Sequence, residues 1–121
     1  MNYIWVTFQR KGLHRYPRAE TDESLADVKY LGSVHRHLFK FKVWIEVFHN
    51  DRDIEFHQFL NFLESLYESK LTLDYESCEM ISNKLAREIR EKYPNRNINI
   101  EVSEDGETGS YYEYHHSTLL N

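Results

Sequence analysis

Hydrophobic and polar positions alternate along four segments of the chain, and each alternation predicts a β-strand. The first segment runs from Tyr3 to Phe8, and the clearest runs from Phe39 to Phe48. Shorter alternations cover Asn97–Glu104 and Ser110–His115, with a polar, glycine-containing turn between them. A period of two places every second side chain on the same face of a sheet. Each segment therefore has one hydrophobic face to bury.

Two other segments carry hydrophobic residues at intervals of three and four, which is the pattern of a helix with one buried stripe. The first is Ile54–Lys70, and the second is Ser77–Tyr93. Asp74 or Ser77 is suited to cap the start of the second helix. Pro94 follows its end and cannot continue it.

The remaining segments are predicted to be irregular. Gly12 and Pro17 interrupt the first strand, and the polar stretch 18–33 is read as a loop. The last residues, 117–121, are expected to fray. The order of elements is then ββααββ, which predicts a single α+β domain over 1–121. Its four-stranded antiparallel sheet would have two helices covering one face.

The second face of that sheet is not cleanly polar. Tyr3, Trp5, Trp44 and Phe48 would lie there, and exposed aromatic residues on a sheet face indicate a partner. The outer strands would also leave unpaired edges that can accept another subunit. We therefore expect a homo-oligomer.

Composition and charge narrow the class of protein. The 121 residues are 40% hydrophobic, enough for one buried core. No hydrophobic run approaches the roughly 20 residues of a membrane span, and the N-terminus lacks the features of a secretion signal. With Cys78 as the single cysteine, no internal disulfide can form. We expect a soluble, cytoplasmic protein without a membrane. The net charge of −5, with scattered lysines and arginines, argues against a nucleic-acid partner.

Seven histidines is a high number for this length, and two of them form the pattern His35-Arg36-His37. Residues two apart in a strand point the same way, so both imidazoles can reach one metal ion. Zinc accepts histidine nitrogen, and a catalytic zinc site has three protein ligands. His14 is our choice for the third. The competing ligands are His49, His57 and the pair His115-His116, and unrelated surface histidines are the alternative reading.

Glu104 shares the strand parity of the buried residues before it, so it points to the helix-covered face. A carboxylate there needs donors, such as the two adjacent N–H groups of a pterin or purine. The alternative is a solvated residue at the strand end. Ser77, Cys78 and Glu79 lie at a predicted helix N-terminus, where free N–H groups favour polar ligands. Cys78 also falls on the hydrophobic stripe, which favours a buried structural cysteine.

Together, the motifs and their order resemble the family of 6-pyruvoyl-tetrahydropterin synthase and 6-carboxytetrahydropterin synthase (QueD). Gly12-Leu13-His14 is similar to the family's small-small-His sequence, and His35-Arg36-His37 to its His-Gly-His. Ser77-Cys78-Glu79-Met80 is similar to its Thr-Ser-Glu-Asn, and Glu104 stands where the family has a ring-anchoring glutamate. The resemblance covers nearly the whole chain. It implies the tunnelling fold, or T-fold, which oligomerises into a barrel.

The resemblance also implies function. His14, His35 and His37 would bind zinc, and the ligand would be pterin-like or purine-like, held at subunit interfaces by Glu104 and the Ser77 region. The reaction would be of the lyase type. The family's Leu-Asp-His segment has only Leu73-Asp74-Tyr75 as a counterpart, and residues 15–34 lack the family's cysteine. Asp74 or His57 would have to act as the catalytic acid or base. The alternative is an inactive module that binds or sequesters a nucleotide or base.

Overall fold

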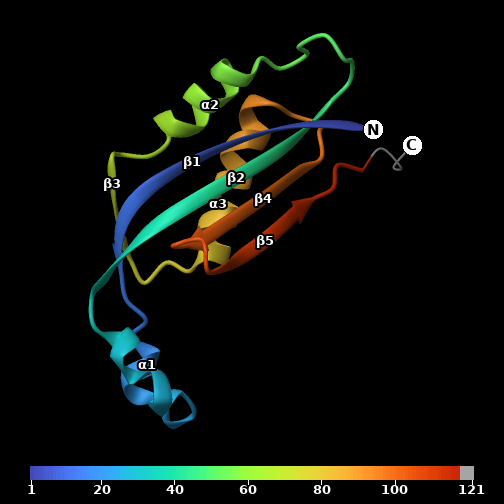
Figure 1. Cartoon of the computed structure of the whole chain (residues 1–121). Coiled ribbons are helices and arrows are strands. Elements are labelled where there is room, and N and C mark those ends of the chain that lie inside the picture. Colours follow the sequence, from blue (N-terminus) through green and yellow to red (C-terminus); the bar gives the residue numbers. More distant parts are fainter. Residues whose placement is uncertain (118–121) are drawn as a thin grey trace.

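Two long antiparallel strands, β1 (Asn2–His14) and β2 (His35–Val47), form the centre of the fold (Figure 1). The computed structural model describes residues 1–117, so most of the predicted frayed tail at 117–121 lies outside the described residues. The strands pair along their whole length, from Asn2 opposite Val47 to His14 opposite His35. The first strand is therefore longer than predicted. Cross-strand pairing continues it through Gly12, which is opposite His37.

Two further strands, β4 (Ile98–Glu104) and β5 (Thr108–Tyr114), extend the sheet beyond β2. The pairs β2–β4 and β4–β5 are antiparallel, as their alternation and the turn between them predicted. The prediction of four strands was wrong, because a fifth strand, β3 (Lys70–Asp74), pairs parallel to β1. The sheet order is β3-β1-β2-β4-β5.

Strand β3 was not predicted from the sequence because it is short and directly follows a helical pattern. The helix α2 (Phe56–Ser65) ends earlier than predicted. Leu71 and Leu73 alternate with exposed residues and are buried in the core. These two leucines join the hydrophobic face of the sheet, so a strand at this edge buries them while its backbone pairs with β1.

The helices α2 and α3 (Cys78–Lys92) cover one face of the sheet, as predicted (Figure 1). Helix α2 packs over β1, and α3 packs over β4 and β5. The largest fully buried side chains come from the helix stripes and from alternate strand positions; they include Phe39, Phe41, Phe59, Leu63, Leu85 and Ile100. The class is therefore α+β, with a five-stranded, mostly antiparallel sheet. No helix in residues 1–117 is long and apolar enough to cross a membrane.

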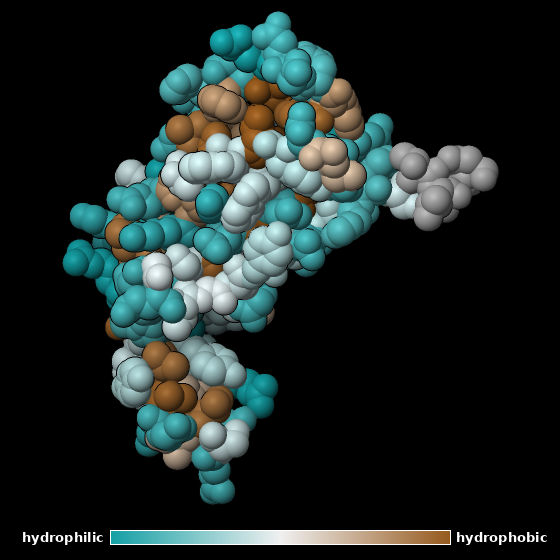
Figure 2. Space-filling model, turned by 45° about the vertical axis from the view of Figure 1, so that its right-hand side comes forward, coloured by the Kyte–Doolittle hydropathy of each residue, from teal (hydrophilic) through white to brown (hydrophobic). Residues whose placement is uncertain are grey.

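The segment predicted as a loop contains two short helices that project beyond one end of the sheet (Figure 1). These are α1 (Arg18–Thr21) and the 3₁₀ segment η1 (Glu23–Gly32), which consists of two helical pieces joined by a kink at Val28. Asp22 ends the first and caps the second by accepting a hydrogen bond from the Ser24 N–H. Polar composition alone suggested a loop, but local capping stabilises helical turns here. Hydrophobic residues reach the surface of this lobe (Figure 2), and Val34 beside it is 64% exposed.

Candidate metal centre

Three histidines meet at the end of the sheet next to the projecting helices. His14 is the last residue of β1, and it lies opposite His35, the first residue of β2. His37 follows two positions later and shares the face of His35. His14 Nδ1 lies 3.2 Å from His35 Nε2, and the ring centroids of His35 and His37 are 4.7 Å apart. The predicted histidine triad is thus brought together within one chain.

Glu104, the last residue of β4, completes the group. Its Oε2 atom lies 3.2 Å from His37 Nε2 and 3.5 Å from His14 Nδ1. One potential ligand atom from each of the four residues lies within 4.8 Å of every other. Four ligands at about 2.0–2.1 Å from a tetrahedral zinc are separated by about 3.3 Å. Three separations in this group, of 3.2, 3.2 and 3.5 Å, are close to that spacing, so the four residues could hold a metal ion.

The carboxylate of Glu104 is only partly solvated, because 24% of its side-chain surface is exposed. Its Oε2 atom is buried and has no hydrogen-bond partner of good geometry among the described residues. A buried acceptor without a donor is costly, because it has lost its water. A protonated histidine of the cluster, a bound cation or an N–H donor from a ligand would each compensate this oxygen. The parity of β4 predicted the direction of Glu104, but not its closeness to the histidines.

Phe39 supports the histidines from the core side. Its ring packs edge-on against His14 and His37, with centroid distances of 6.0 and 5.9 Å. Gly12 makes room for this ring, because a Cβ atom at position 12 would lie 2.8 Å from Phe39 Cε2. The close approach explains why a glycine stands within the strand.

Two of the imidazoles have fixed orientations. His35 Nδ1 lies 2.7 Å from the Ser33 carbonyl oxygen, and His37 Nδ1 lies 2.7 Å from Asp105 Oδ2. Both partners only accept hydrogen bonds, so each Nδ1 carries the proton. In the neutral rings the lone pairs are then on the Nε2 atoms. His37 Nε2 lies 3.2 Å from Glu104 Oε2, and His35 Nε2 lies 3.2 Å from His14 Nδ1. Sequence reasoning missed Ser33 and Asp105, because loop contacts leave no periodic signal.

Burial and charge act in opposite directions on His14. Burial lowers the pKa of its imidazole, while the carboxylate of Glu104 raises it and the two other histidines lower it further. The net shift is downward, which favours the neutral imidazole. Metal ions bind the neutral form, so this environment is compatible with a ligand role.

Asp74, predicted as a catalytic residue, lies next to His14 in the β1–β3 register but points to solvent. Its carboxylate pairs with Arg15, with 3.1 Å between Oδ1 and Nε. His57, the second predicted catalytic residue, is exposed in the first turn of α2. That turn lies by the opposite end of the sheet, near Asn2 and Val47. The structure does not bring His57 to the cluster within one chain.

Ser77, Cys78 and Glu79, which were predicted to bind a ligand at the N-terminus of the second helix, have different surroundings. Ser77 caps α3 by accepting a hydrogen bond from the Met80 N–H, and Glu79 is exposed. Cys78 is buried, and burial, with help from the charge of Glu104, raises the pKa of its thiol to about 11. A thiol with that pKa stays protonated at neutral pH and is a poor nucleophile.

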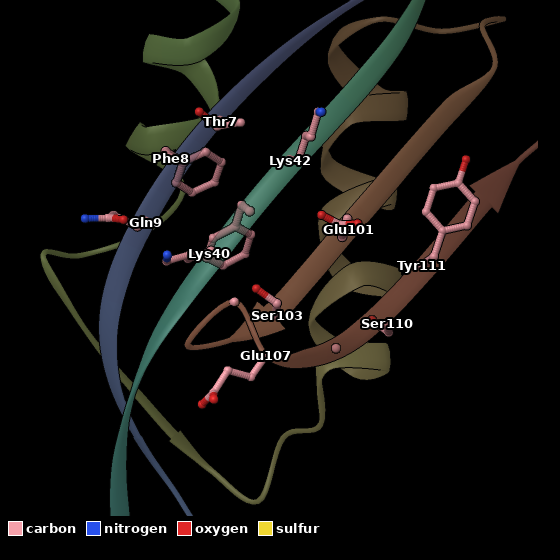
Figure 3. Close-up of a pocket in the computed structure, with 13 residues that line it drawn as sticks. Thr7, Phe8, Gln9, Lys40, Lys42, Glu101, Ser103, Glu107, Ser110 and Tyr111 are labelled. Carbon is pink, nitrogen blue, oxygen red and sulfur yellow. The ribbon is translucent and has the colours of Figure 1, made fainter.

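The other histidines lie elsewhere. His49 is near Asp53, and His115 is near Glu113 on β5. A cavity of about 770 Å³ lies mainly on the sheet face that the helices leave open (Figure 3). Lys40, Lys42 and Tyr111 are among its lining residues, and none of the three clustered histidines is. Neither a scan against protein-family models nor a search of curated proteins finds a match to this chain.

Proposed function

We propose that this chain is a zinc protein similar to 6-pyruvoyl- and 6-carboxytetrahydropterin synthases, with a pterin-like or purine-like ligand beside the metal. His14, His35 and His37 would hold the zinc. The observation that carries the proposal is the buried Oε2 atom of Glu104, which has no hydrogen bond of good geometry and lies next to three clustered imidazoles. An assembly of the T-fold type would place the site at a subunit interface.

Glu104 has a clear role in such a site. Once the histidine lone pairs face a metal, they no longer offer protons to the carboxylate. The amide and amino N–H groups on one edge of a pterin or a guanine-type purine supply two donors in a row, and a carboxylate accepts such a pair well. The net interaction is worth about 1.5–3 kcal/mol for a charged acceptor.

The same residues suggest how lyase-type chemistry would be divided. Zinc, when bound, acts as a Lewis acid toward a ligand oxygen. Glu104 orients the ring, and the buried Phe39 excludes water from the core side of the histidines. A proton must then be moved by another group. Asp74 is the nearest of the predicted candidates in the sheet register, and it would have to leave Arg15 to act.

A second function, a binding module without turnover, is favoured by the state of the predicted acid–base groups. Asp74 is exposed and ion-paired, Cys78 is buried with a raised pKa, and His57 lies at the far end of the sheet. A module of this kind would hold or sequester a nucleotide or base beside the same histidines.

Metal content tests the first step of the proposal. Protein purified without chelator should contain about one zinc per chain, as expected of a single four-coordinate site. His35→Ala should lose the metal, whereas His115→Ala, which changes an exposed histidine outside the cluster, should retain it. Wild-type protein without zinc, together with unchanged thermal stability of His35→Ala, would refute the proposal.

Ligand titration and turnover separate the two functions. Calorimetry with pterins and purine nucleotides should detect binding that is about 10–100-fold weaker in Glu104→Gln, because the charged acceptor is lost. Conversion of dihydroneopterin triphosphate would select the enzyme, and binding without conversion would select the module. Equal ligand affinity of wild type and Glu104→Gln would contradict the ring-anchoring role.

A further inference from the structure

Asp105 connects three groups at the turn between β4 and β5. Its backbone N–H donates to the Leu38 carbonyl oxygen at 2.7 Å. Its Oδ1 atom accepts from the Leu38 N–H at 2.8 Å, and its Oδ2 atom lies 2.7 Å from His37 Nδ1. The backbone of Asp105 and one carboxylate oxygen are thus fixed on β2, and the second oxygen faces the imidazole.

We propose that Asp105 is a positioning residue for the metal centre, because it holds His37 in the tautomer whose Nε2 lone pair faces the cluster. This inference rests on the proposed zinc site. Asp105 is not one of the four grouped residues, and it acts through His37.

The chemistry of imidazole makes this contact decisive. A neutral histidine carries its proton on either Nδ1 or Nε2, and only the nitrogen without the proton can bind a metal. A carboxylate offers no donor, so the Asp105 oxygen at 2.7 Å favours the proton on Nδ1. The Glu104 Oε2 atom lies farther away, 3.2 Å from Nε2, and makes no hydrogen bond of good geometry there. The hydrogen bonds to Leu38 also fix the carboxylate, so the imidazole plane is held as well. Partners of this kind typically change metal affinity by about 10–100-fold.

The Nδ1 atom of His35 is also held by a hydrogen-bond acceptor, but that acceptor is a backbone carbonyl oxygen and not a carboxylate. The Ser33 carbonyl oxygen, two residues earlier in the chain, accepts the His35 Nδ1–H. A backbone carbonyl cannot be removed by substitution, but the carboxylate of Asp105 can. A substitution at Asp105 can therefore change the tautomer of His37 while His37 itself stays in place.

The substitution Asp105→Asn tests this inference. Asp105 has a φ of +60°, a conformation that asparagine tolerates better than most residues. The Leu38 N–H requires an acceptor, so the amide oxygen should take the place of Oδ1. The amide NH₂ would then face His37 Nδ1 as a donor and favour the proton on Nε2. The matched control is Glu107→Gln, a carboxylate-to-amide change at an exposed position of the same turn.

Two measurements are needed. Nitrogen NMR of metal-free protein at alkaline pH reports which nitrogen of His37 carries the proton. Competition with a chromophoric chelator reports zinc affinity. We expect the proton on Nδ1 in wild type and on Nε2 in Asp105→Asn, with zinc affinity reduced about 10–100-fold and Glu107→Gln unchanged. The melting temperature of the metal-free variants shows whether they fold.

The outcomes separate this inference from the proposed function. If the tautomer is the same in both proteins, or zinc affinity stays within about twofold of wild type, the role of Asp105 is overturned and the zinc site stands. If wild-type protein binds no zinc, the proposed function fails. The tautomer measurement then decides by itself whether Asp105 orients His37. If Asp105→Asn does not fold, Asp105→Ser, which removes the carboxylate without placing an amide donor, is read by the same two measurements.

Discussion

The carboxylate of Asp53 fastens the segment between β2 and α2 to the sheet. Its Oδ2 atom accepts hydrogen bonds from Arg96 Nη1 and from the Phe48 N–H, both at 2.8 Å. Arg96 also donates to the Glu46 carbonyl oxygen. A single residue therefore links the loop to the ends of β2 and β4, on the side of the molecule away from the histidines.

These contacts make stability depend on pH. The hydrogen bond from Arg96, followed by that from Phe48, lowers the pKa of Asp53 below its usual value of 3.8. A carboxylate with a lowered pKa in the folded state stabilises the protein above its unfolded pKa, and the contribution is lost as the pH falls toward the folded pKa. Asp53→Asn should therefore reduce the free energy of unfolding near neutral pH and lessen its decline below about pH 4. Urea denaturation at several pH values measures this.

Asp51→Asn is the control for Asp53, because the Asp51 side chain is 80% exposed and pairs only with the equally exposed Arg52. Its pH profile should match that of wild type. An Asp53→Asn profile that also matches wild type would contradict the assigned role of Asp53.

Helix α3 shows how one element can serve both fold and site. Its stripe of Cys78, Ile81, Leu85 and Ile89 is buried against β4 and β5, and its first turn lies close enough to Glu104 for that charge to raise the pKa of Cys78. Ser77 was predicted as a ligand-binding residue. The structure gives it a local role as the cap of this helix.

Two substitutions separate the capping role of Ser77 from a ligand-binding role. Ser77→Ala should lower the free energy of unfolding by about 1 kcal/mol, because the Met80 N–H loses its acceptor. Ser77→Asp should keep most of the stability, because aspartate caps helices as well as serine does. Chemical denaturation measures both. If Ser77→Asp is as stable as wild type but binds pterins more weakly, Ser77 also contacts the ligand. If Ser77→Ala loses no stability, the cap is unimportant.

On the scale of the whole molecule, the sheet has two open edges and one uncovered face. Strands β3 and β5 are the outer strands. Helices α2 and α3 cover one face of the sheet and leave the other face uncovered. Trp5 and Phe48 are 55% and 61% exposed. Lys42 lies over the rings of Trp5 and Trp44, with its Nζ 4.4 and 4.9 Å from the ring centroids.

These features support the expected homo-oligomer. Unpaired N–H and C=O groups along β3 and β5 gain hydrogen bonds when another sheet edge is added. Light scattering over a range of micromolar concentrations should therefore give a mass several times that of one chain. A single-chain mass throughout that range would contradict the prediction and would remove subunit interfaces from the proposed site.

Much of the fold was already determined by local sequence patterns. Four strands and two helices were predicted because side-chain periodicity directly reflects backbone geometry. The same reasoning placed His35 and His37 on one face and turned Glu104 toward the helix-covered side. His14 was a choice among several histidines, and pairing along all of β1 and β2 brought it opposite His35.

Only the tertiary structure decided the remaining features of the fold and of the site, because these features depend on contacts between segments far apart in the chain. The parallel pairing of β3 with β1 stabilises a strand too short to be recognised by its own pattern. The sequence pattern around Gly12 predicts an interruption of the strand. In the structure, Gly12 lies within β1 and makes room for the Phe39 ring, which packs against the histidines. Asp105 is an ordinary turn residue until folding places its carboxylate 2.7 Å from His37. Sequence periodicity thus determined which faces are buried, and long-range packing determined which polar groups meet.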